Sequence, residues 1–339
     1  LVPDVALRTI VCSRVKELEA SFDQLGTDEY AALRGDLLAQ LEAGPITVAA
    51  DEANQQHYDL PPEFFAAVLG PWLKYSCCNW PEGTTSLAEA EEAMLALTAE
   101  RAGLRDGQTI LDLGCGWGSL ALWAAERYPE SRLLAVSNSH SQRRYIEGEV
   151  RRRGLRNLRV VTADVSDFDP RERFDRVVSV EMLEHVRNHG ALFKRISDWL
   201  QPEGRLFVHV FCHRRHLYLF EVDGAGSWMA EHFFRGGIMP SWDYLLGYQD
   251  DLTLLERWEV GGAHYAKTLL AWLKNLDLRR NLVMPVLDNT YGRDRASLWL
   301  VYWRLFFLSC AETFALADGR SYFVGHYLFG PPFEPPIAS

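Results

Sequence analysis

Short β-rich apolar runs alternate with amphipathic segments through the middle of the chain. Because strands that alternate with helices pair in parallel through crossover connections, this pattern predicts a doubly wound α/β sheet. The predicted strands are TILDL (109–113), RLLAV (132–136), LRVVT (158–162), FDRVVSV (174–180) and RLFVHVF (205–211), and the helices between them are SLALWAAERY (119–128), SQRRYIEGEVRRRG (141–154) and ALFKRISDWL (191–200).

The N-terminal part lacks this alternation. Residues 1–75 carry helical patterns such as RVKELEASFDQL (14–25) and YAALRGDLLAQLEA (30–43), which predict a helical N-terminal cap. The pair Ser86 and Glu89 has the spacing of a capping box, so it predicts the start of the helix that leads into the first strand.

The C-terminal part is rich in aromatic residues around two further strand candidates, TLLERWEV (253–260) and SYFVGHYLF (321–329). We therefore predict one domain over residues 76–339, whose sheet carries helical insertions at about 212–250 and 261–320.

The amino-acid composition indicates which kinds of molecule this protein binds. Lys and Arg total 35 against 46 for Asp and Glu, and this net charge of −11 disfavours binding to nucleic acid or to an anionic bilayer. No apolar run approaches the roughly 20 residues of a membrane span, and the first residues lack the layout of a secretion signal. We expect a cytoplasmic protein without integral membrane association that acts on a small molecule; the oligomeric state stays open, with a homodimer among the options.

The six cysteines are scattered along the chain, without the paired spacing of a metal site. Their density is too low for a disulfide scaffold. We expect reduced thiols and no metal.

A glycine-rich turn follows the first predicted strand directly. In LDLGCGWG, Gly114 and Gly116 come after Asp112 and before a helix, where glycine lets the backbone approach a ligand. A dinucleotide site would show G-x-G-x-x-G, whereas this spacing is G-x-G-x-G. After the third strand, Asp164 can accept a hydrogen bond from an adenine amino group while the Val165 amide faces a ring nitrogen. The arrangement fits S-adenosylmethionine better than a nicotinamide cofactor.

The stretch VVSVEMLEH (177–185) brings Glu181, Glu184 and His185 to the end of the fourth strand, beside the first strand. A protonated amine has no lone pair to accept a methyl group, so a base must remove its proton. Two carboxylates would attract the cation, and an imidazole with a pKa near ~6.5 would take the proton. If a helix began at Glu181, the three side chains would share one face. The alternative is a structural helix start with a packed histidine.

Three motifs, LDLGCGWG, AVSNSHSQ and FDRVVSVEMLEH, closely resemble the cyclopropane-fatty-acid-synthase-like branch of class I methyltransferases. Within that branch the chain most resembles the plant benzylisoquinoline N-methyltransferases, typified by coclaurine N-methyltransferase. Similar segments extend from about residue 55 to 330. The resemblance implies a Rossmann-like methyltransferase sheet and S-adenosylmethionine as cofactor.

The resemblance also implies how the cofactor is held. Tyr75 and Ser76 close over the cofactor, and Gly114 and Gly116 approach its methionine part. Asn138 and Gln142 serve the ribose side, and Asp164 and Val165 serve the adenine.

For the acceptor, the resemblance implies that the matching Glu and His bind substrate and remove its proton. Cyclopropane synthases typically carry Gly where Glu181 stands. Aromatic residues are expected by the substrate, although a helical stripe of this kind is core by default; they are Tyr302, Trp303 and Phe306, with Trp80 and Tyr58 as further pocket walls.

A competing interpretation comes from the same resemblance. Cyclopropane synthases hold a bicarbonate base with Glu, His and Tyr, and Glu184, His209 and Tyr265 stand at the matching places. The sequence thus predicts an S-adenosylmethionine-dependent methyltransferase acting on the nitrogen of a small amine. The alternatives are a lipid-modifying methyltransferase or cyclopropane synthase, and a non-catalytic cofactor-binding protein.

Overall fold

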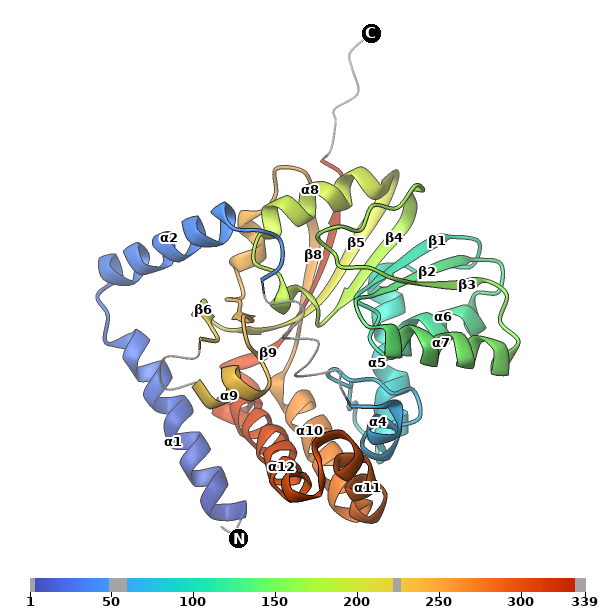
Figure 1. Cartoon of the computed structure of the whole chain (residues 1–339). Coiled ribbons are helices and arrows are strands. Elements are labelled where there is room, and N and C mark those ends of the chain that lie inside the picture. The colour runs from blue at the N-terminus through green and yellow to red at the C-terminus, as the bar shows by residue number, and fades with distance from the viewer. Residues whose placement is uncertain (1–3, 49–59, 222–226, 333–339) are drawn as a thin grey trace.

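The computed structural model describes residues 4–48, 60–221 and 227–332, and its centre is a seven-stranded sheet in the order β3-β2-β1-β4-β5-β9-β8 (Figure 1). The strands are β1 (Thr109–Leu113), β2 (Arg132–Ser137), β3 (Leu158–Thr162), β4 (Phe174–Val180), β5 (Leu200–His213), β8 (Thr253–Val260) and β9 (Tyr322–Gly330). Strands β1 to β5 pair in parallel, and β9 runs antiparallel between β5 and β8. The predicted doubly wound α/β fold is confirmed.

Helices cover both faces of the sheet. On one face lie α5 (Leu87–Ala102), α6 (Ser119–Arg127) and α7 (His140–Arg153), and on the other lies α8 (His189–Trp199). Neighbouring residues of β1 point to opposite sides, as strand geometry requires. Ile110 joins the core under α5 and α6, whereas Leu111 joins the core under α8.

The predicted capping box at the start of α5 is confirmed. The Ser86 side chain accepts from the Glu89 amide, and the Glu89 carboxylate accepts from the Ser86 amide. This exchange satisfies two amide groups that the first helical turn leaves unpaired. It fixes the helix that leads into β1.

A second layer of helices forms a separate apolar core beside the sheet. It contains α4 (Pro62–Val68), α10 (Gly262–Leu278), α11 (Arg280–Tyr291) and α12 (Arg293–Ala315), and α1 (Asp4–Asp23) packs along α12 (Figure 1). Large buried rings such as Phe64, Trp272 and Trp303 fill this core. Helix α10 thereby comes close to the carboxyl ends of β4 and β5.

The remaining elements lie in the N-terminal part and in the first insertion. Helix α2 (Thr27–Ala43) packs on α8. The insertion between β5 and β8 is mixed instead of helical, because β6 (Tyr218–Leu219) pairs with β7 (Ile238–Met239) beside α9 (Ser227–His232).

Among the described residues, one helical segment, 293–319, is long and apolar enough to span a membrane. Arg304 interrupts it, and Trp303 and Phe307 are buried in the helical core. A core helix passes the same test of length and composition.

Candidate active site

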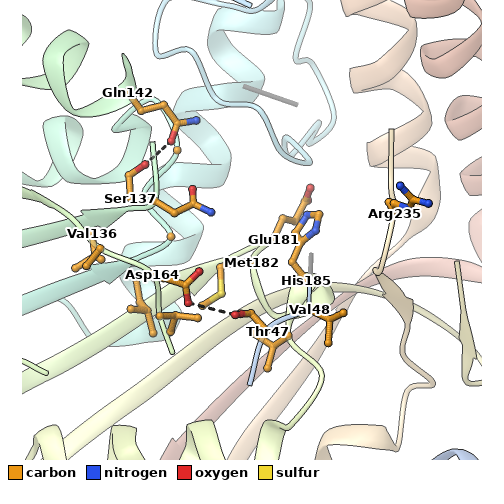
Figure 2. Close-up of a pocket in the computed structure, with 17 residues that line it drawn as sticks. Thr47, Val48, Val136, Ser137, Gln142, Asp164, Glu181, Met182, His185 and Arg235 are labelled. Carbon is orange, nitrogen blue, oxygen red and sulfur yellow. Dashed lines mark hydrogen bonds between the residues drawn. The ribbon is translucent and has the colours of Figure 1, made fainter. Parts of the chain in front are cut away.

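A pocket opens at the carboxyl ends of β1 to β4 (Figure 2). Open α/β sheets bind ligands at this edge. A second pocket adjoins it and shares Gly114, Gly116, Gln142 and Glu181. The eight residues predicted to hold the cofactor all line one or both of these pockets: Tyr75, Ser76, Gly114, Gly116, Asn138, Gln142, Asp164 and Val165.

The glycine turn after β1 needs glycine at two positions for two reasons. Gly114 has a φ of +84°, and a Cβ there would lie 2.5 Å from Cγ of Met182. Gly116 has a φ of +53°, yet a Cβ there would meet no atom of the described residues within 4 Å. Gly114 is therefore required by packing, whereas Gly116 leaves open the space of the pocket itself.

Polar groups after β2 and β3 line the next part of the pocket. Ser137 donates to Oε1 of Gln142 over 2.6 Å, while Nε2 of Gln142 is buried and has no hydrogen-bond partner within residues 4–48, 60–221 and 227–332. Oδ1 of Asp164 accepts from the Ser166 amide at 2.7 Å and from the Thr47 hydroxyl at 3.2 Å (Figure 2). Thr47 thus brings the N-terminal segment against the adenine side of the predicted cofactor site.

The second pocket contains a group that sequence reasoning did not assign to the site. Asp112 lines it, is 4% exposed, and its Oδ2 has no hydrogen-bond partner in the part of the chain that the structure describes. Burial raises the pKa of Asp112 to about 7. Ser119 adds an unpartnered buried hydroxyl. A buried carboxylate oxygen and open polar atoms fit the charged ammonium and carboxylate groups of the methionine part of S-adenosylmethionine. The position of Asp112 at the end of β1 was the signal in the sequence.

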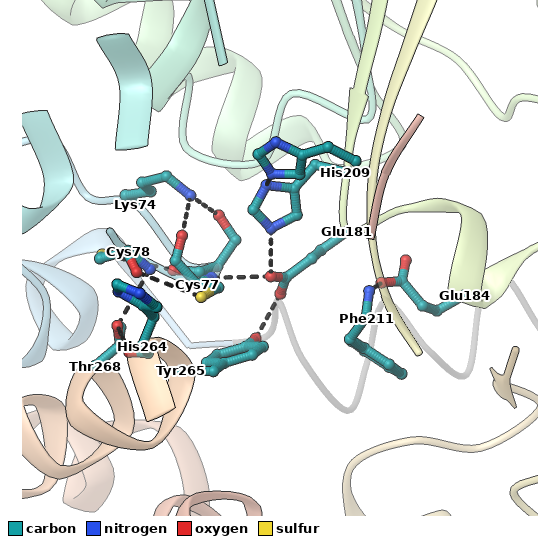
Figure 3. Close-up of polar contacts among 12 residues, drawn as sticks. Lys74, Cys77, Cys78, Glu181, Glu184, His209, Phe211, His264, Tyr265 and Thr268 are labelled. Carbon is teal, nitrogen blue, oxygen red and sulfur yellow. Dashed lines mark hydrogen bonds and ion pairs between the residues drawn. The ribbon is translucent and has the colours of Figure 1, made fainter. Parts of the chain in front are cut away.

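At the other end of the first pocket stands Glu181, whose backbone adopts the left-handed conformation with φ +48°. Its carboxylate accepts three hydrogen bonds: from the Cys77 amide at 2.8 Å, from Nε2 of His209 at 3.0 Å and from the Tyr265 hydroxyl at 2.5 Å (Figure 3). Burial raises the pKa of Glu181, and Lys74 and the hydrogen bonds oppose this rise. The strained turn and three donors fix the carboxylate in one place.

Glu184 lies in a different environment, although it is only three residues away. No α-helix begins at Glu181, and a 3-10 turn covers Leu183–His185 instead, so the expectation of one helical face was wrong. The positive φ at Glu181 rotates the two side chains apart. Oε1 of Glu184 accepts from the Phe211 amide at 2.8 Å, on the far side of the turn (Figure 3). Glu184 is fully buried, which raises its pKa well above the ordinary value, and it lines neither pocket.

His185 lines the first pocket beside Glu181 (Figure 2). Its ring centroid lies 4.6 Å from that of Phe234. Burial lowers the pKa of His185 to about 4, against the ordinary value of ~6.5 assumed from the sequence. The imidazole is therefore neutral at physiological pH.

The grouping expected for a bicarbonate base is not assembled as predicted. His209 and Tyr265 both donate to Glu181, and Glu184 contacts neither through a hydrogen bond. Behind this cluster Lys74 is 3% exposed, and its ammonium donates to the Ser76 hydroxyl at 2.5 Å and to the Cys77 carbonyl at 2.7 Å. Lys74 thus supports the segment that carries both a cofactor residue and one of the donors to Glu181.

Of the aromatic residues predicted to contact substrate, the four that the structure describes line neither pocket. Trp303 is fully buried in the helical core, and Phe306 stacks on Phe233 with ring centroids 4.4 Å apart. The Tyr302 ring lies 4.7 Å from that of His232. Trp80 donates its indole N–H to Thr268, and Tyr58 falls outside the described residues.

Known proteins resemble this chain in both sequence and structure. The family described as mycolic acid cyclopropane synthetase matches residues 47–319. The chain belongs to this family. A similar solved structure is that of coclaurine N-methyltransferase bound to N-methylheliamine and SAH, with a TM-score of 0.93 and 35% identity over 97% of this chain and 96% of that one.

Two relatives compared by sequence represent two activities. (S)-coclaurine N-methyltransferase of Thalictrum flavum subsp. glaucum is 37% identical over 306 residues, covering 89% of this chain and 85% of the relative. Cyclopropane-fatty-acyl-phospholipid synthase of Escherichia coli (strain K12) is 32% identical over 267 residues, covering 78% of this chain and 65% of the relative. This protein is an S-adenosylmethionine-dependent methyltransferase, as the sequence predicted.

Proposed function

We propose that this methyltransferase transfers its methyl group to the nitrogen of a small amine, in the manner of a coclaurine N-methyltransferase. Glu181 carries the proposal, because it presents a carboxylate to the pocket at the end opposite the adenine-binding residues. Bound S-adenosylmethionine supplies a methyl group on positively charged sulfur, which a nitrogen lone pair can displace. The protein has to attract the amine and remove its proton.

Glu181 acts as the cation anchor. Its side chain is only 9% exposed, and an ionised carboxylate at such a site is unfavourable unless a cation or hydrogen bonds compensate it. The three donors hold the carboxylate without neutralising it, so an ammonium group that enters the pocket gains a strong charge-assisted hydrogen bond. An uncharged alkene would gain nothing from this carboxylate.

His185 acts as the general base. The side chain lies beside Glu181 in the same pocket, its lowered pKa keeps the imidazole neutral at pH 7, and the nearby Glu181 carboxylate raises the proton affinity of the ring. The ammonium group held at Glu181 must lose a proton before it can react. Transfer of this proton to His185 leaves the amine with a lone pair. Glu181 then faces an imidazolium, which it stabilises.

Glu184 supports this arrangement from behind the turn. It ties the turn after β4 to the backbone of β5 through the Phe211 amide, and its buried carboxyl group has one further oxygen without a partner. We assign it the task of holding Glu181 and His185 in register.

The bicarbonate-dependent alternative has less room for its base. A bicarbonate ion would require the hydrogen-bond donors of His209 and Tyr265, and the Glu181 carboxylate already accepts from both. The Glu181 carboxylate, a planar anion with two acceptor oxygens, thus takes the place of a bicarbonate ion between these two donors. This substitution favours nitrogen as the acceptor over a lipid alkene.

Product formation tests the proposal. The protein is incubated with S-adenosylmethionine and heliamine, the parent amine of the product bound in the similar structure, and separately with phospholipid vesicles that contain unsaturated acyl chains. Each reaction is run with and without bicarbonate, and products are identified by mass spectrometry. We expect N-methylheliamine without bicarbonate; turnover confined to lipid and dependent on bicarbonate would replace this proposal by the alternative.

A further inference from the structure

A continuous chain of polar side chains extends from Glu181 away from the pocket, across the sheet. Nδ1 of His209 lies 2.9 Å from Nε2 of His326, and Nδ1 of His326 lies 2.8 Å from a guanidinium nitrogen of Arg101. Both histidines are fully buried and lie opposite each other on the paired strands β5 and β9. Arg101 comes from the last turn of α5, and its guanidinium also lies over the Trp258 ring at 5.1 Å.

The donor and the acceptor of each hydrogen bond between these side chains follow from Arg101, the residue farthest from Glu181. A guanidinium can only donate, so Nδ1 of His326 must be the acceptor. A neutral His326 then carries its proton on Nε2 and donates it to Nδ1 of His209. His209 in turn carries its proton on Nε2, which faces Oε1 of Glu181. One donor that cannot be reversed therefore orients two imidazole rings.

The charge state of the two rings follows from the same geometry. A proton added to Nδ1 of His326 would point an N–H at the N–H of Arg101, and one added to Nδ1 of His209 would point at the N–H of His326. Both additions lose a hydrogen bond and create repulsion in a buried site. Burial also lowers the pKa of each histidine well below its ordinary value.

We infer that Arg101 is a positioning residue of this enzyme, which fixes the tautomers of His326 and His209 and so keeps an N–H of His209 directed at Glu181. The inference rests on the proposed function, because it explains how Glu181, the proposed cation anchor, is held in place. It also assigns His209 a role: the ring is a hydrogen-bond donor to Glu181 and cannot remove a proton from the substrate, because its Nε2 already carries one.

The tautomers can be measured directly in the full-length protein. Long-range ¹H–¹⁵N correlation spectra distinguish Nε2–H from Nδ1–H imidazoles when histidine is ¹⁵N-labelled. In the wild type we expect His209 and His326 both as Nε2–H tautomers, unchanged when S-adenosylmethionine is added. An Nδ1–H tautomer or an imidazolium at either position would overturn the inference, whatever amine the enzyme methylates.

Three substitutions test whether Arg101 causes this orientation. Arg101→Met keeps an apolar side chain beside Trp258 and removes the donor, Arg101→Lys keeps a donor that cannot accept, and Arg257→Met is the matched control. Arg257 also lies over a tryptophan, at 4.7 Å from the Trp242 ring, on the neighbouring strand β8. In Arg101→Met, Nδ1 of His326 loses the donor that opposes its protonation. We expect His326 to take up a proton there as pH falls, seen as an imidazolium, in Arg101→Met only, with the neutral wild-type form kept in Arg101→Lys and Arg257→Met.

Kinetics with heliamine as acceptor give a second measurement. Loss of a supporting contact behind an active group lowers activity by about 10- to 100-fold, and here kcat should fall about tenfold in Arg101→Met while KM for S-adenosylmethionine stays the same. Arg101→Lys should recover most of this loss. Wild-type tautomers and kcat in Arg101→Met would refute the inference. Expected tautomers in an enzyme that does not methylate heliamine would instead count against the proposed function alone.

Discussion

The two ends of the pocket are built in different ways. At the cofactor end, most of the predicted residues follow the strands β1, β2 and β3, and buried polar atoms such as Nε2 of Gln142 and Oδ2 of Asp112 have no hydrogen-bond partner among the described residues. At the acceptor end, Cys77, His209 and Tyr265 come from distant segments, and all three donate to Glu181. One end leaves its polar groups open for a ligand, whereas the other has already satisfied them.

This difference indicates what each end does. Open polar atoms in a buried pocket are favourable only when a ligand supplies their partners, so the cofactor end is a binding site. A carboxylate held by three donors in a strained turn is fixed before anything binds, which is typical of a group that acts in catalysis. Substitutions at the two ends should therefore separate cofactor affinity from turnover.

Gly116→Val should have the largest effect and should be confined to the cofactor end. A β-branched residue is strongly disfavoured at a φ of +53°, and its methyl groups would occupy the pocket instead of contacting protein. We expect no measurable S-adenosylmethionine binding by isothermal calorimetry, in a protein whose circular dichroism is unchanged.

The matched control for this substitution is Gly148→Val. Gly148 lies in α7 with a negative φ and open space around its Cβ, so this variant should bind the cofactor normally. If Gly116→Val bound the cofactor with wild-type affinity, Gly116 would not face the cofactor.

His185→Ala should have the next largest effect, on turnover at the acceptor end. Removal of a general base costs about 10²- to 10⁴-fold, so we expect about a thousandfold loss of kcat/KM at pH 7 with little change in cofactor affinity. The loss should shrink as pH rises toward the pKa of the amine, because more substrate then arrives unprotonated. The measurement is kcat/KM for heliamine against pH.

The wild-type profile supplies a further check on His185. Because the pKa of His185 is lowered to about 4, protonation of this residue should not reduce activity between pH 5 and 8. His140→Ala, on the exposed start of α7, is the control for loss of an imidazole. A His185→Ala profile parallel to that of the wild type, without recovery at high pH, would exclude this residue as the base.

Glu181→Gln should lower kcat/KM for the amine by about a hundredfold. The substitution deletes the charge that attracts the ammonium, and its amide group must direct an N–H at one of three donors that face the carboxylate. Steady-state kinetics should show a raised KM for the amine together with a lower kcat.

Glu184→Gln is the matched comparison, because its remaining oxygen can still accept from the Phe211 amide. We expect a smaller loss than in Glu181→Gln. An equal or greater loss would show that the two glutamates act together on the substrate and would contradict the division of roles proposed here.

The smallest expected effect is a pH dependence of cofactor affinity that originates at Asp112. With its pKa raised to about 7 in the free protein, Asp112 is protonated below pH 7 and must lose that proton to attract an ammonium group. The Kd for S-adenosylmethionine should therefore fall as pH rises, by at most about tenfold per pH unit, and level off above pH 7.

Asp112→Asn should bind the cofactor more weakly and abolish this dependence. The same substitution should change the pH dependence of stability of the free protein. A raised pKa stabilises the folded state at low pH, and this contribution is lost as pH rises from about 4 to about 7. Identical affinity profiles for the wild type and Asp112→Asn would remove Asp112 from the cofactor site.

Much of this enzyme was predictable from local sequence. All seven strands of the central sheet were located from their β-rich runs, and the limits of β1, β3, β4 and β8 were predicted to the residue. Strand β5 is longer than predicted at both ends, because Leu200 pairs with Phe174 of β4 and His213 pairs with Tyr322 of β9.

At the cofactor end, Gly114, Asp164 and Val165 follow β1 and β3 closely, and parallel strands bring their carboxyl ends to one edge. Tyr75 and Ser76 lie in the loop before α5 and were predicted only from the family resemblance.

Only the tertiary structure determined the acceptor end. The sequence placed Glu181, Glu184 and His185 together, but a positive φ at Glu181 sends the two carboxylates to opposite sides of the turn. Burial by distant segments, which a local pattern does not contain, lowers the pKa of His185.

The chain from Arg101 to Glu181 is the extreme case of this dependence on tertiary contacts. Arg101, His209 and His326 lie up to 225 residues apart, and no spacing in the sequence relates them. Strand pairing between β5 and β9 and the packing of α5 on the sheet bring them into contact. The backbone conformation after each strand is determined by a few adjacent residues. The protonation state and the orientation of a buried side chain depend instead on every segment that surrounds it.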